Sequence, residues 1–364
     1  MVTGERVILT ETSADSGVFV SSVVVNTDGS VNADDGILDL YTGDKLRAFY
    51  SDEVTVNDLE DEIRAETHYA TTVLRAQNYT QDTVWTPANS PYLILGDINV
   101  NRDSTLTLQA GTEVLFLPDT DYSGNGNYYN KTEIFIEGTI QFLGNVDAPI
   151  SLKSLSDIPS NSDWGGLRLY ESGDLTISHT EIKNAEAALN LYFNDEEAKL
   201  NIDHSVFKDS KEGLNFYSCY ECDVTIKNSE FSNITYRAIE AYGESGTVNF
   251  SDNIISDTGD IFLNYFSKVT FNGNVFDDIG YLNFYGMSYY LDFSENTIDK
   301  TEGVFISSSY YEEQPLDFNI SDNIIIGPGY QGLVLSISSA GDVELSVTGN
   351  TVRGFGIYSP YDYG

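Results

Sequence analysis

A short pattern that recurs about every two dozen residues constrains the fold of this chain more than any other feature. The pattern is an apolar residue, two further residues, Asn or a small hydroxyl residue, one residue and a second apolar residue. Its copies begin at Ile177, Ile202, Ile226, Phe250, Phe271, Phe293, Ile320 and Val347, with spacings of 25, 24, 24, 21, 22, 27 and 27 residues. This regularity predicts a solenoid, because each coil must return to the same place above the previous one.

A second short strand follows each copy of the pattern. LNLY at Leu189 and LNFY at Leu214 are two examples. In LNLY the alternation sends Leu189 and Leu191 inward, and Asn190 and Tyr192 outward. No segment shows sustained 3.6-residue periodicity, so we expect no helices between the strands. Short strands without crossover helices predict an all-β fold, a parallel β-helix.

The polar position of the pattern has a structural explanation. Its occupants in successive coils are Thr180, Ser205, Ser229, Asn253, Asn274, Asn296, Asn323 and Asn350. Stacked Asn side chains can form hydrogen bonds from coil to coil, and Asn tolerates the left-handed backbone conformation of a tight turn. We therefore interpret this ladder as scaffold rather than as a binding site.

The region that leads into the repeats carries a family resemblance. Trp85, a Leu-Thr-Leu-x-x-Gly-Thr-x-Val-x-Phe segment at residues 106–116, a Gly-Thr-Ile-x-Phe-x-Gly segment at 138–144 and Trp-Gly-Gly-Leu at 164–167 stand in this order. The stretch resembles the opening of right-handed β-helix domains in large bacterial and archaeal cell-surface proteins. The resemblance implies a right-handed β-helix over residues 85–364 and an extracellular or cell-surface location. It says little about activity, because the family serves in adhesion, structure and some polysaccharide cleavage.

Residues 1–76 differ from the repeats. Residues 10–19 and 43–46 resemble a hairpin and a later strand of the Ig-like β-sandwich modules found in the same surface proteins. A full sandwich has about seven strands, and five or six are apparent here. The resemblance therefore implies a small N-terminal Ig-like module that is either incomplete or shorter than usual, with residues 77–84 as a linker to the β-helix.

The net charge of the chain limits the classes of partner that it is expected to bind. Asp and Glu number 57 against 18 Lys and Arg, which gives a net charge of −39. This charge disfavours nucleic acids and anionic membrane surfaces. No apolar run reaches the roughly 18 residues that span a bilayer, so we expect no membrane insertion. An acidic surface attracts cations such as Ca²⁺, although it also serves solubility in a salty medium.

One loop has oxygen-bearing side chains at calcium-ligand spacing. Asp119, Asp121, Ser123 and Asn125 occupy alternate positions, and Gly124 is the sixth residue. Ca²⁺ takes six to eight oxygen ligands, and this spacing allows one loop to wrap around the ion. Asn130 stands at the twelfth position in place of a bidentate Glu. The sequence thus predicts Ca²⁺ as a possible cofactor, with a flexible Gly- and Asn-rich loop as the alternative.

The two cysteines, Cys219 and Cys222, are close together in the sequence. A redox role would require the start of a helix in a thioredoxin-like fold, and zinc would require four ligands. In an oxidising compartment we expect a local disulfide between them.

The residues for catalysis are sparse, and we predict that the chain is not an enzyme. Asp277 and Asp278 are the one adjacent acid pair that we consider within the coils, and no Arg-x-Lys element accompanies them. His179 and His204 lie one coil apart, where a stacked surface pair is a simpler interpretation than a metal site. A divergent polysaccharide lyase remains an alternative.

The strongest candidate for a binding surface is the outward face of the second strand. Its fourth residue is aromatic in five successive coils: Tyr192, Tyr217, Tyr242, Phe266 and Tyr285. Two residues earlier stand Asn190, Asn215, Glu240, Asn264 and Asn283. Flat rings about 4.8 Å apart beside polar groups suit a glycan or a surface protein. The alternatives are that the rings only stack on each other, or that a loop or second protein covers them.

These observations favour an extracellular adhesion or scaffold protein. The first alternative is a structural subunit of a surface filament or layer, which would self-associate through exposed end coils or through its sandwich module. The second is the lyase.

Overall fold

The structure is a computed structural model in which two compact units, Met1–Val73 and Leu74–Gly364, can be separated. It describes residues 7–14, 16, 18–27, 36–52, 61–124, 126–170, 174–192, 199–219, 222–243, 246–308, 315–328, 332–338 and 341–354.

The first unit contains short sheets in its described part. Strands β1 (Thr10–Glu11) and β2 (Phe19–Val20) pair antiparallel, and β3 (Val24–Asn26) and β4 (Ile37–Asp39) pair parallel. The hairpin of β5 (Lys45–Asp52) and β6 (Asp61–His68) pairs antiparallel over eight residues of each strand. These are three separate two-stranded sheets, so the Ig-like sandwich stays a prediction.

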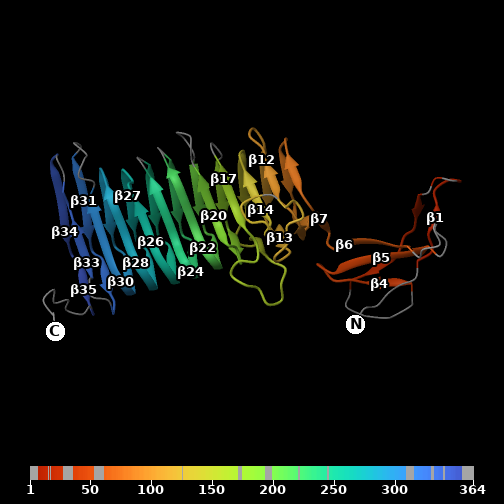
Figure 1. The fold of residues 1–364 in the computed structure, drawn as a ribbon. Helices are drawn as coiled ribbons and strands as arrows, with labels where there is room; N and C mark the ends of the chain where they lie inside the picture. Colours follow the sequence, from red (N-terminus) through yellow and green to blue (C-terminus); the bar gives the residue numbers. More distant parts are fainter. Residues whose placement is uncertain are drawn as a thin grey trace. The chain divides into compact units, whose positions relative to one another are not determined.

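The second unit is a stack of parallel coils (Figure 1). One sheet takes one strand from each of eleven coils. Its strands are β9 (Thr83–Trp85), β12 (Thr105–Gln109), β15 (Thr139–Leu143), β18 (Leu175–Ser178), β21 (Lys199–Asp203), β23 (Asp223–Lys227), β25 (Thr247–Ser251), β27 (Lys268–Asn272), β29 (Tyr290–Ser294), β31 (Leu316–Ser321) and β34 (Val343–Thr348). The predicted parallel β-helix is confirmed.

An 18-stranded sheet supplies the other sides of the coils. Its strands are β7 (Thr72–Leu74), β8 (Gln77–Tyr79), β10 (Tyr92–Ile94), β11 (Ile98–Val100), β13 (Glu113–Phe116), β14 (Glu133–Ile136), β16 (Ile150–Ser154), β17 (Gly166–Tyr170), β19 (Thr180–Lys183), β20 (Ala187–Tyr192), β22 (Val206–Cys219), β24 (Glu230–Gly243), β26 (Ile254–Asn264), β28 (Val275–Met287), β30 (Thr297–Ser308), β32 (Ile324–Ile326), β33 (Leu333–Ser336) and β35 (Thr351–Arg353). A single 3₁₀ turn, η1 (Pro87–Asn89), is the one helical element among the described residues.

The long strands of the middle coils each turn a corner of the coil. Both β19 and β20 pair with β22, so one long strand covers the two sides that separate strands cover earlier. A residue in the left-handed conformation lies within each long strand, with φ between 50° and 57°. These corner residues are Asp209, Asn233, Asp257, Asp278 and Lys300. Asp and Asn are the residues that adopt this conformation most readily after Gly, which explains why they dominate this position.

The first coil begins earlier than the sequence indicates. Strand β8 pairs with β11 and strand β9 pairs with β12, both in parallel register. Residues 77–84, which the resemblance assigns to a linker, are therefore part of the first coil. The short strand β8 lacks the repeated pattern of the later coils, so pairing with β11 rather than local sequence places it in the fold.

The polar ladder is an internal scaffold element. Asn274 Oδ1 accepts hydrogen bonds from the backbone N of Asn253 at 2.9 Å and from its Nδ2 at 3.1 Å. The same pair of bonds recurs from Asn274 to Asn296 and onward to Asn323 and Asn350. The expected left-handed turn is one residue earlier than predicted. His179, His204, Asn228, Asp252, Glu295 and Asp322 adopt it, which leaves the ladder residue free to bond to the next coil.

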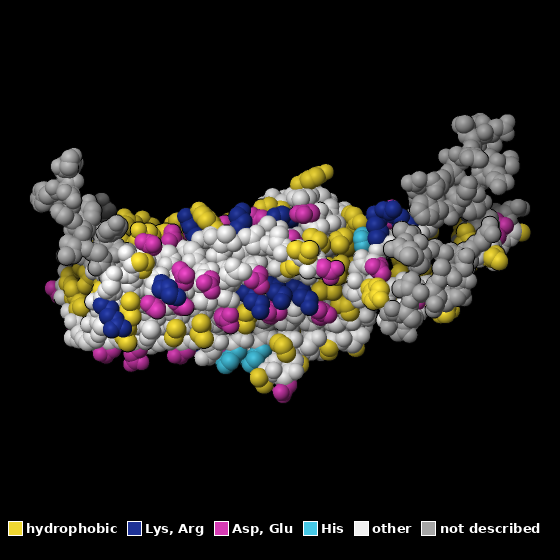
Figure 2. All heavy atoms as spheres, turned by 90° about the horizontal axis from the view of Figure 1, so that it is seen from below, with side chains coloured by type: hydrophobic (Ala, Val, Ile, Leu, Met, Phe, Trp, Pro, Cys, Tyr) yellow, Lys and Arg dark blue, Asp and Glu magenta, His cyan; other side chains and the backbone are white. Residues whose placement is uncertain are grey.

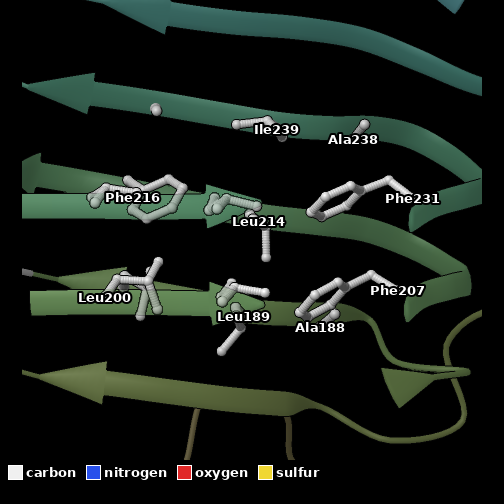
Figure 3. Packing of buried hydrophobic residues seen from close by; sticks show 14 of the residues in the cluster. Ala188, Leu189, Leu200, Phe207, Leu214, Phe216, Phe231, Ala238 and Ile239 are labelled. Carbon is white, nitrogen blue, oxygen red and sulfur yellow. The ribbon is translucent and has the colours of Figure 1, made fainter. Parts of the chain in front are cut away.

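The hydrophobic core lies inside the coils and stacks side chains of similar type (Figure 3). Leu189, Leu214 and Ile239 are partners in register in three successive coils, and each is at most 1% exposed. The rings of Phe207 and Phe231 stack beside them at 5.0 Å. The inward orientation predicted for the first and third residues of the second strand is confirmed in the coils of Leu189 and Leu214.

Candidate functional site

The outward residues of the second strand form two columns in parallel register. One column runs through Arg168, Asn190, Asn215, Glu240, Phe262, Asn283 and Phe305. The other runs through Tyr170, Tyr192 and Tyr217, continues with Tyr242, whose ring stacks on that of Tyr217, and goes on through Asn264 and Tyr285. Together these two columns make up the outer face of the second strand.

The prediction that Phe266 belongs to the aromatic column is wrong. Phe266 is fully buried in the core, and Asn264 occupies the position that pairs with Tyr242 and Tyr285. The sequence LNYF is similar to LNFY of another coil. In this coil, however, Ile261 and Leu263 point inward and set the strand phase. Tyr265 follows in the left-handed conformation, with φ of 62°, and the chain then turns into the core.

The N-terminal part of the aromatic column is a continuous stack of rings. Phe135, Tyr170, Tyr192, Tyr217 and Tyr242 follow one another at centroid distances of 6.1, 5.3, 5.2 and 6.4 Å. The interplanar angles are at most 21°. Burial, together with the nearby carboxylate of Glu240, raises the pKa of Tyr217 to about 12. Here the rings stabilise the sheet, as the stacking alternative anticipates.

The loop between β13 and β14 covers this part of the outer face. Arg168 lies 4.9 Å from the centroid of the Tyr128 ring. Asn127 Nδ2 donates to Tyr170 Oη at 3.2 Å, and Lys131 Nζ binds Glu186 Oε2 at 2.6 Å. Polar side chains of this part of the outer face are buried. Arg168, Asn190 and Asn215 are 2%, 6% and 1% exposed. We call the outer face from Arg168 to Asn215, with its tyrosines, the covered half.

A buried ion pair anchors the covered half. Arg168 Nε donates to Glu133 Oε1, and both side chains are almost fully buried. Burial alone would lower the pKa of Arg168, but the carboxylate of Glu133 outweighs it and the pKa is raised. The backbone N of Asn127 also donates to Glu133, at 2.7 Å, which fixes the loop to the same pair.

Further ion pairs surround this anchor. Burial raises the pKa of Glu186, but hydrogen bonds from Lys131 and Lys211 outweigh it and hold the pKa below its ordinary value. Between β19 and β22, Lys208 binds Glu181 at 2.6 Å. Figure 2 shows a face on which Lys and Arg alternate with Asp and Glu. In a chain of net charge −39, the ion pairs of Lys131, Arg168 and Lys211 neutralise carboxylates next to the loop.

The C-terminal part of the outer face presents exposed aromatic side chains instead. Tyr242, Tyr265, Tyr281 and Tyr285 are 40%, 46%, 40% and 56% exposed. Tyr265 contacts Tyr285 edge to face at 5.4 Å, and Tyr281 contacts Phe305 at 5.6 Å. We call this region the open half. It consists of Arg237, Tyr242, Phe262, Tyr265, Tyr281, Asn283, Tyr285 and Phe305.

Polar groups are interleaved with the rings of the open half. The guanidinium of Arg237 lies 5.1 Å from the centroid of the Phe262 ring and also binds Glu240. Asn283 is half-buried between Phe262 and Phe305 in the register of the sheet. Sequence reasoning identified Tyr242 and Tyr285 but missed Phe262, Tyr265, Tyr281 and Phe305. Tyr281 precedes an inward Leu in the pattern and could have been found from the strand alternation.

The predicted calcium loop is brought together only in part. Asp121 Oδ1 accepts hydrogen bonds from the backbone N of Ser123 at 2.9 Å and from its hydroxyl. Ser123 Oγ in turn accepts from the backbone N of Asp97 at 3.0 Å. Asp119 is exposed and Asn125 lies outside the described residues. In the described part of the chain no three Asp, Glu, His or Cys side chains form a group that could hold a metal ion.

Three other predicted positions lie apart from both halves. Cys222 is buried and disulfide-bonded, and Cys219 is the only other cysteine in the sequence. Asp277 binds Lys300 at 2.7 Å in a surface ion pair. The rings of His179 and His204 stack at 4.8 Å, and their Nδ1 atoms bind Ser178 and Asp203.

Comparison with known proteins agrees with this architecture. Within the described residues, no helix is long and apolar enough to pass through a membrane. Neither the curated proteins nor the solved structures include a match to the chain. A family model described as "Right handed beta helix region" matches residues 165–352, slightly over half of the 364 residues. The chain therefore belongs to the right-handed β-helix family.

Proposed function

We propose that this protein is an extracellular scaffold that binds a neutral glycan on the open half of its β-helix. The observation that carries the proposal is the group of four exposed tyrosines among half-buried Phe262, Asn283 and Phe305. An exposed cluster of aromatic side chains of this size is typical of an interaction surface. Sugar rings offer an apolar face to an aromatic ring and hydroxyl groups to neighbouring polar side chains.

The charge of the chain argues for a neutral rather than an anionic glycan. The net charge is −39, and the basic residue of the open half, Arg237, is already bound to Glu240. An anionic polysaccharide would therefore meet repulsion that no free cation of the open half offsets. A surface protein with a polar, sugar-like contact face is the alternative occupant that the test must distinguish.

The proposal is binding without cleavage. Polysaccharide lyases and hydrolases need acidic residues arranged around a bond, with a base or a second carboxylate in reach. Asp277 is bound to Lys300, and Asp278 forms the corner of its coil with φ of 57°. These roles favour a structural function for both residues. An extracellular location accords with the disulfide at Cys222.

A glycan array tests the proposal. Wild type should bind one class of neutral glycan, and Tyr281→Ser combined with Tyr285→Ser should weaken this binding by at least about tenfold, because two stacking contacts contribute about 1.4 kcal/mol or more. Tyr129→Ser is the matched control, since Tyr129 is 84% exposed and lies outside the open half. Absence of glycan binding by wild type, or equal loss in the control, would reject the proposal.

Self-association is a second candidate function, supported by the last described coil. Val343, Leu345 and Val347 of β34 are 46%, 43% and 45% exposed. Their partners in register, Leu316, Phe318 and Ile320, are buried in the core. Inward-facing residues of one coil that remain exposed form a sheet edge suited to pairing. Sedimentation of wild type and Leu345→Lys tests this: a concentration-dependent assembly that the variant abolishes would support it, and monomers throughout would oppose it.

A further inference from the structure

A pocket with several polar side chains in its lining lies beside the loop between β13 and β14, at the N-terminal end of the β-helix. Its volume is about 460 Å³, and its lining includes Asn78, Asp97, Asn99, Ser123, Gly126 and Phe135. The pocket is separate from the open half and does not depend on the function proposed above.

One carboxylate oxygen of this pocket, and a second one on Asp121 next to the lining residue Ser123, are buried without a hydrogen-bond partner. Asp97 is 2% exposed, and its Oδ1 accepts from the backbone N of Glu133 at 2.8 Å while its Oδ2 has no partner. Asp121 Oδ2 is also buried and unpartnered, whereas Asp121 Oδ1 is held by Ser123. Burying a carboxylate oxygen without a hydrogen-bond donor costs free energy, so a compensating group such as a cation is expected nearby.

The two carboxylates that act most on Asp97 do not supply this compensation. The charges that act most on Asp97 are the carboxylates of Asp121 and Glu133, both of the same sign. Glu133 has its own partner in Arg168. A β-carbon added to Gly126 would lie 3.3 Å from Asp97 Oδ2 and 2.3 Å from Glu133 Oε2. The absence of a side chain at Gly126 therefore lets the loop approach the acidic residues and leaves space beside Asp97 Oδ2.

We propose that this pocket binds a Ca²⁺ ion through Asp97 Oδ2 and Asp121 Oδ2. Hard cations prefer oxygen ligands, and Ca²⁺ accepts a mixture of carboxylate, hydroxyl, amide and water oxygens in flexible geometry. Ser123 and the amide side chains that line the pocket are neutral oxygen donors within the same site. The ligand set differs from the one expected from the loop sequence, because Asp97 of the preceding coil replaces the exposed Asp119. Two carboxylates rather than three or four favour weak affinity, in the range of extracellular calcium modules.

Calcium-dependent melting of the full chain tests the proposal. Protein treated with EDTA should melt at a higher temperature when millimolar CaCl₂ is added, and less so with MgCl₂, because bound ligand stabilises the folded state. Asp97→Asn and Asp121→Asn should each abolish most of the calcium response. Asp119→Asn is the matched control, and it should keep the response although it removes the same charge.

A second measurement covers the case in which a variant fails to fold. Tb³⁺, which replaces Ca²⁺ at oxygen sites, should bind the wild type with luminescence excited through nearby tyrosine, and Ca²⁺ should displace it. Absence of both the melting response and displaceable Tb³⁺ would overturn the proposal. A response lost in Asp119→Asn but retained in Asp97→Asn would overturn it as well, because the ion would then lie in the loop alone.

Discussion

The two halves of the outer face use the same strand positions for opposite purposes. In the covered half, Tyr192 lies between Tyr170 and Tyr217 at 5.3 and 5.2 Å, and Asn190 beside it is 6% exposed. In the open half, Tyr285 occupies the same column and is 56% exposed. Equivalent positions of a solenoid thus differ in exposure, and in the covered half the loop between β13 and β14 contacts the outer face at Arg168 and Tyr170.

Charged side chains contribute to holding the loop between β13 and β14 on the sheet. Its residues Asn127, Tyr128 and Lys131 contact Tyr170, Arg168 and Glu186 on the sheet. The open half has rings and Asn283 at the positions that Arg168 and its neighbours fill in the covered half. In the covered half Arg168 and Glu186 hold the loop, whereas the described open half presents mainly aromatic side chains.

The largest effect is expected at the anchor of the covered half. Arg168→Ala should lower the free energy of unfolding by about 3–5 kcal/mol, because it leaves the buried carboxylate of Glu133 without its partner. Arg168→Met combined with Glu133→Gln should recover most of this loss, since neither charge remains buried. Urea denaturation measures both variants. A loss below about 1 kcal/mol in the single variant would mean that the pair does not hold the loop.

Replacing one tyrosine in each half compares the two halves directly, with smaller expected losses of stability. Tyr192→Ser should cost about 1–2 kcal/mol, because it removes a ring stacked on both sides. Tyr285→Ser should cost about 0.5 kcal/mol or less, because most of its surface is already exposed. Thermal denaturation of the two variants under one condition checks the prediction. Equal losses of stability in the two variants would contradict the proposed difference between the halves.

The smallest effect concerns pH. Lys131 and Lys211 hold the pKa of Glu186 below its ordinary value of 4.5, so the ionised carboxylate stabilises the folded state above that pH. Lys131→Met should lower stability by about 1 kcal/mol or less at pH 7. This difference should shrink as the pH falls below 4.5 and Glu186 becomes protonated. Melting curves of wild type and variant from pH 7 to pH 3 test it, and a difference that grows in acid would contradict the assigned ion pair.

The coil repeat and its ladder could be predicted because they are local in the sequence. Each ladder position recurs with its flanking apolar residues, and the inward direction of Leu189 and Leu214 follows from strand alternation. The strand phase of the coil that contains Phe266 could not be predicted from the sequence. The segment LNYF looks like LNFY of another coil, but this coil is shorter and its inward positions are shifted. Only the register with Tyr242 and Tyr285 shows that Asn264 is the outward residue.

The covering of one half depends on contacts between distant residues. Lys131 and Glu186 are 55 positions apart, and Asn127 and Tyr170 are 43 positions apart. The periodicity of the sequence does not predict such contacts. The same holds for the pocket, where Asp97 and Ser123 meet across a coil. The loop motif contains Asp121 and Ser123, which the structure places next to Asp97, whereas Asp97 itself lies outside the motif in the preceding coil.

Hydroxyl-radical footprinting of the folded protein tests the central claim, that the loop and not the strand position decides which tyrosines are accessible. Mass spectrometry after labelling should show rapid modification of Tyr281 and Tyr285 and protection of Tyr170 and Tyr192, whereas all four should react alike in the urea-denatured chain. In Arg168→Ala combined with Lys131→Ala, which releases the loop, Tyr170 should gain reactivity and Tyr285 should not change. Equal modification of Tyr192 and Tyr285 in the folded wild type would contradict the account.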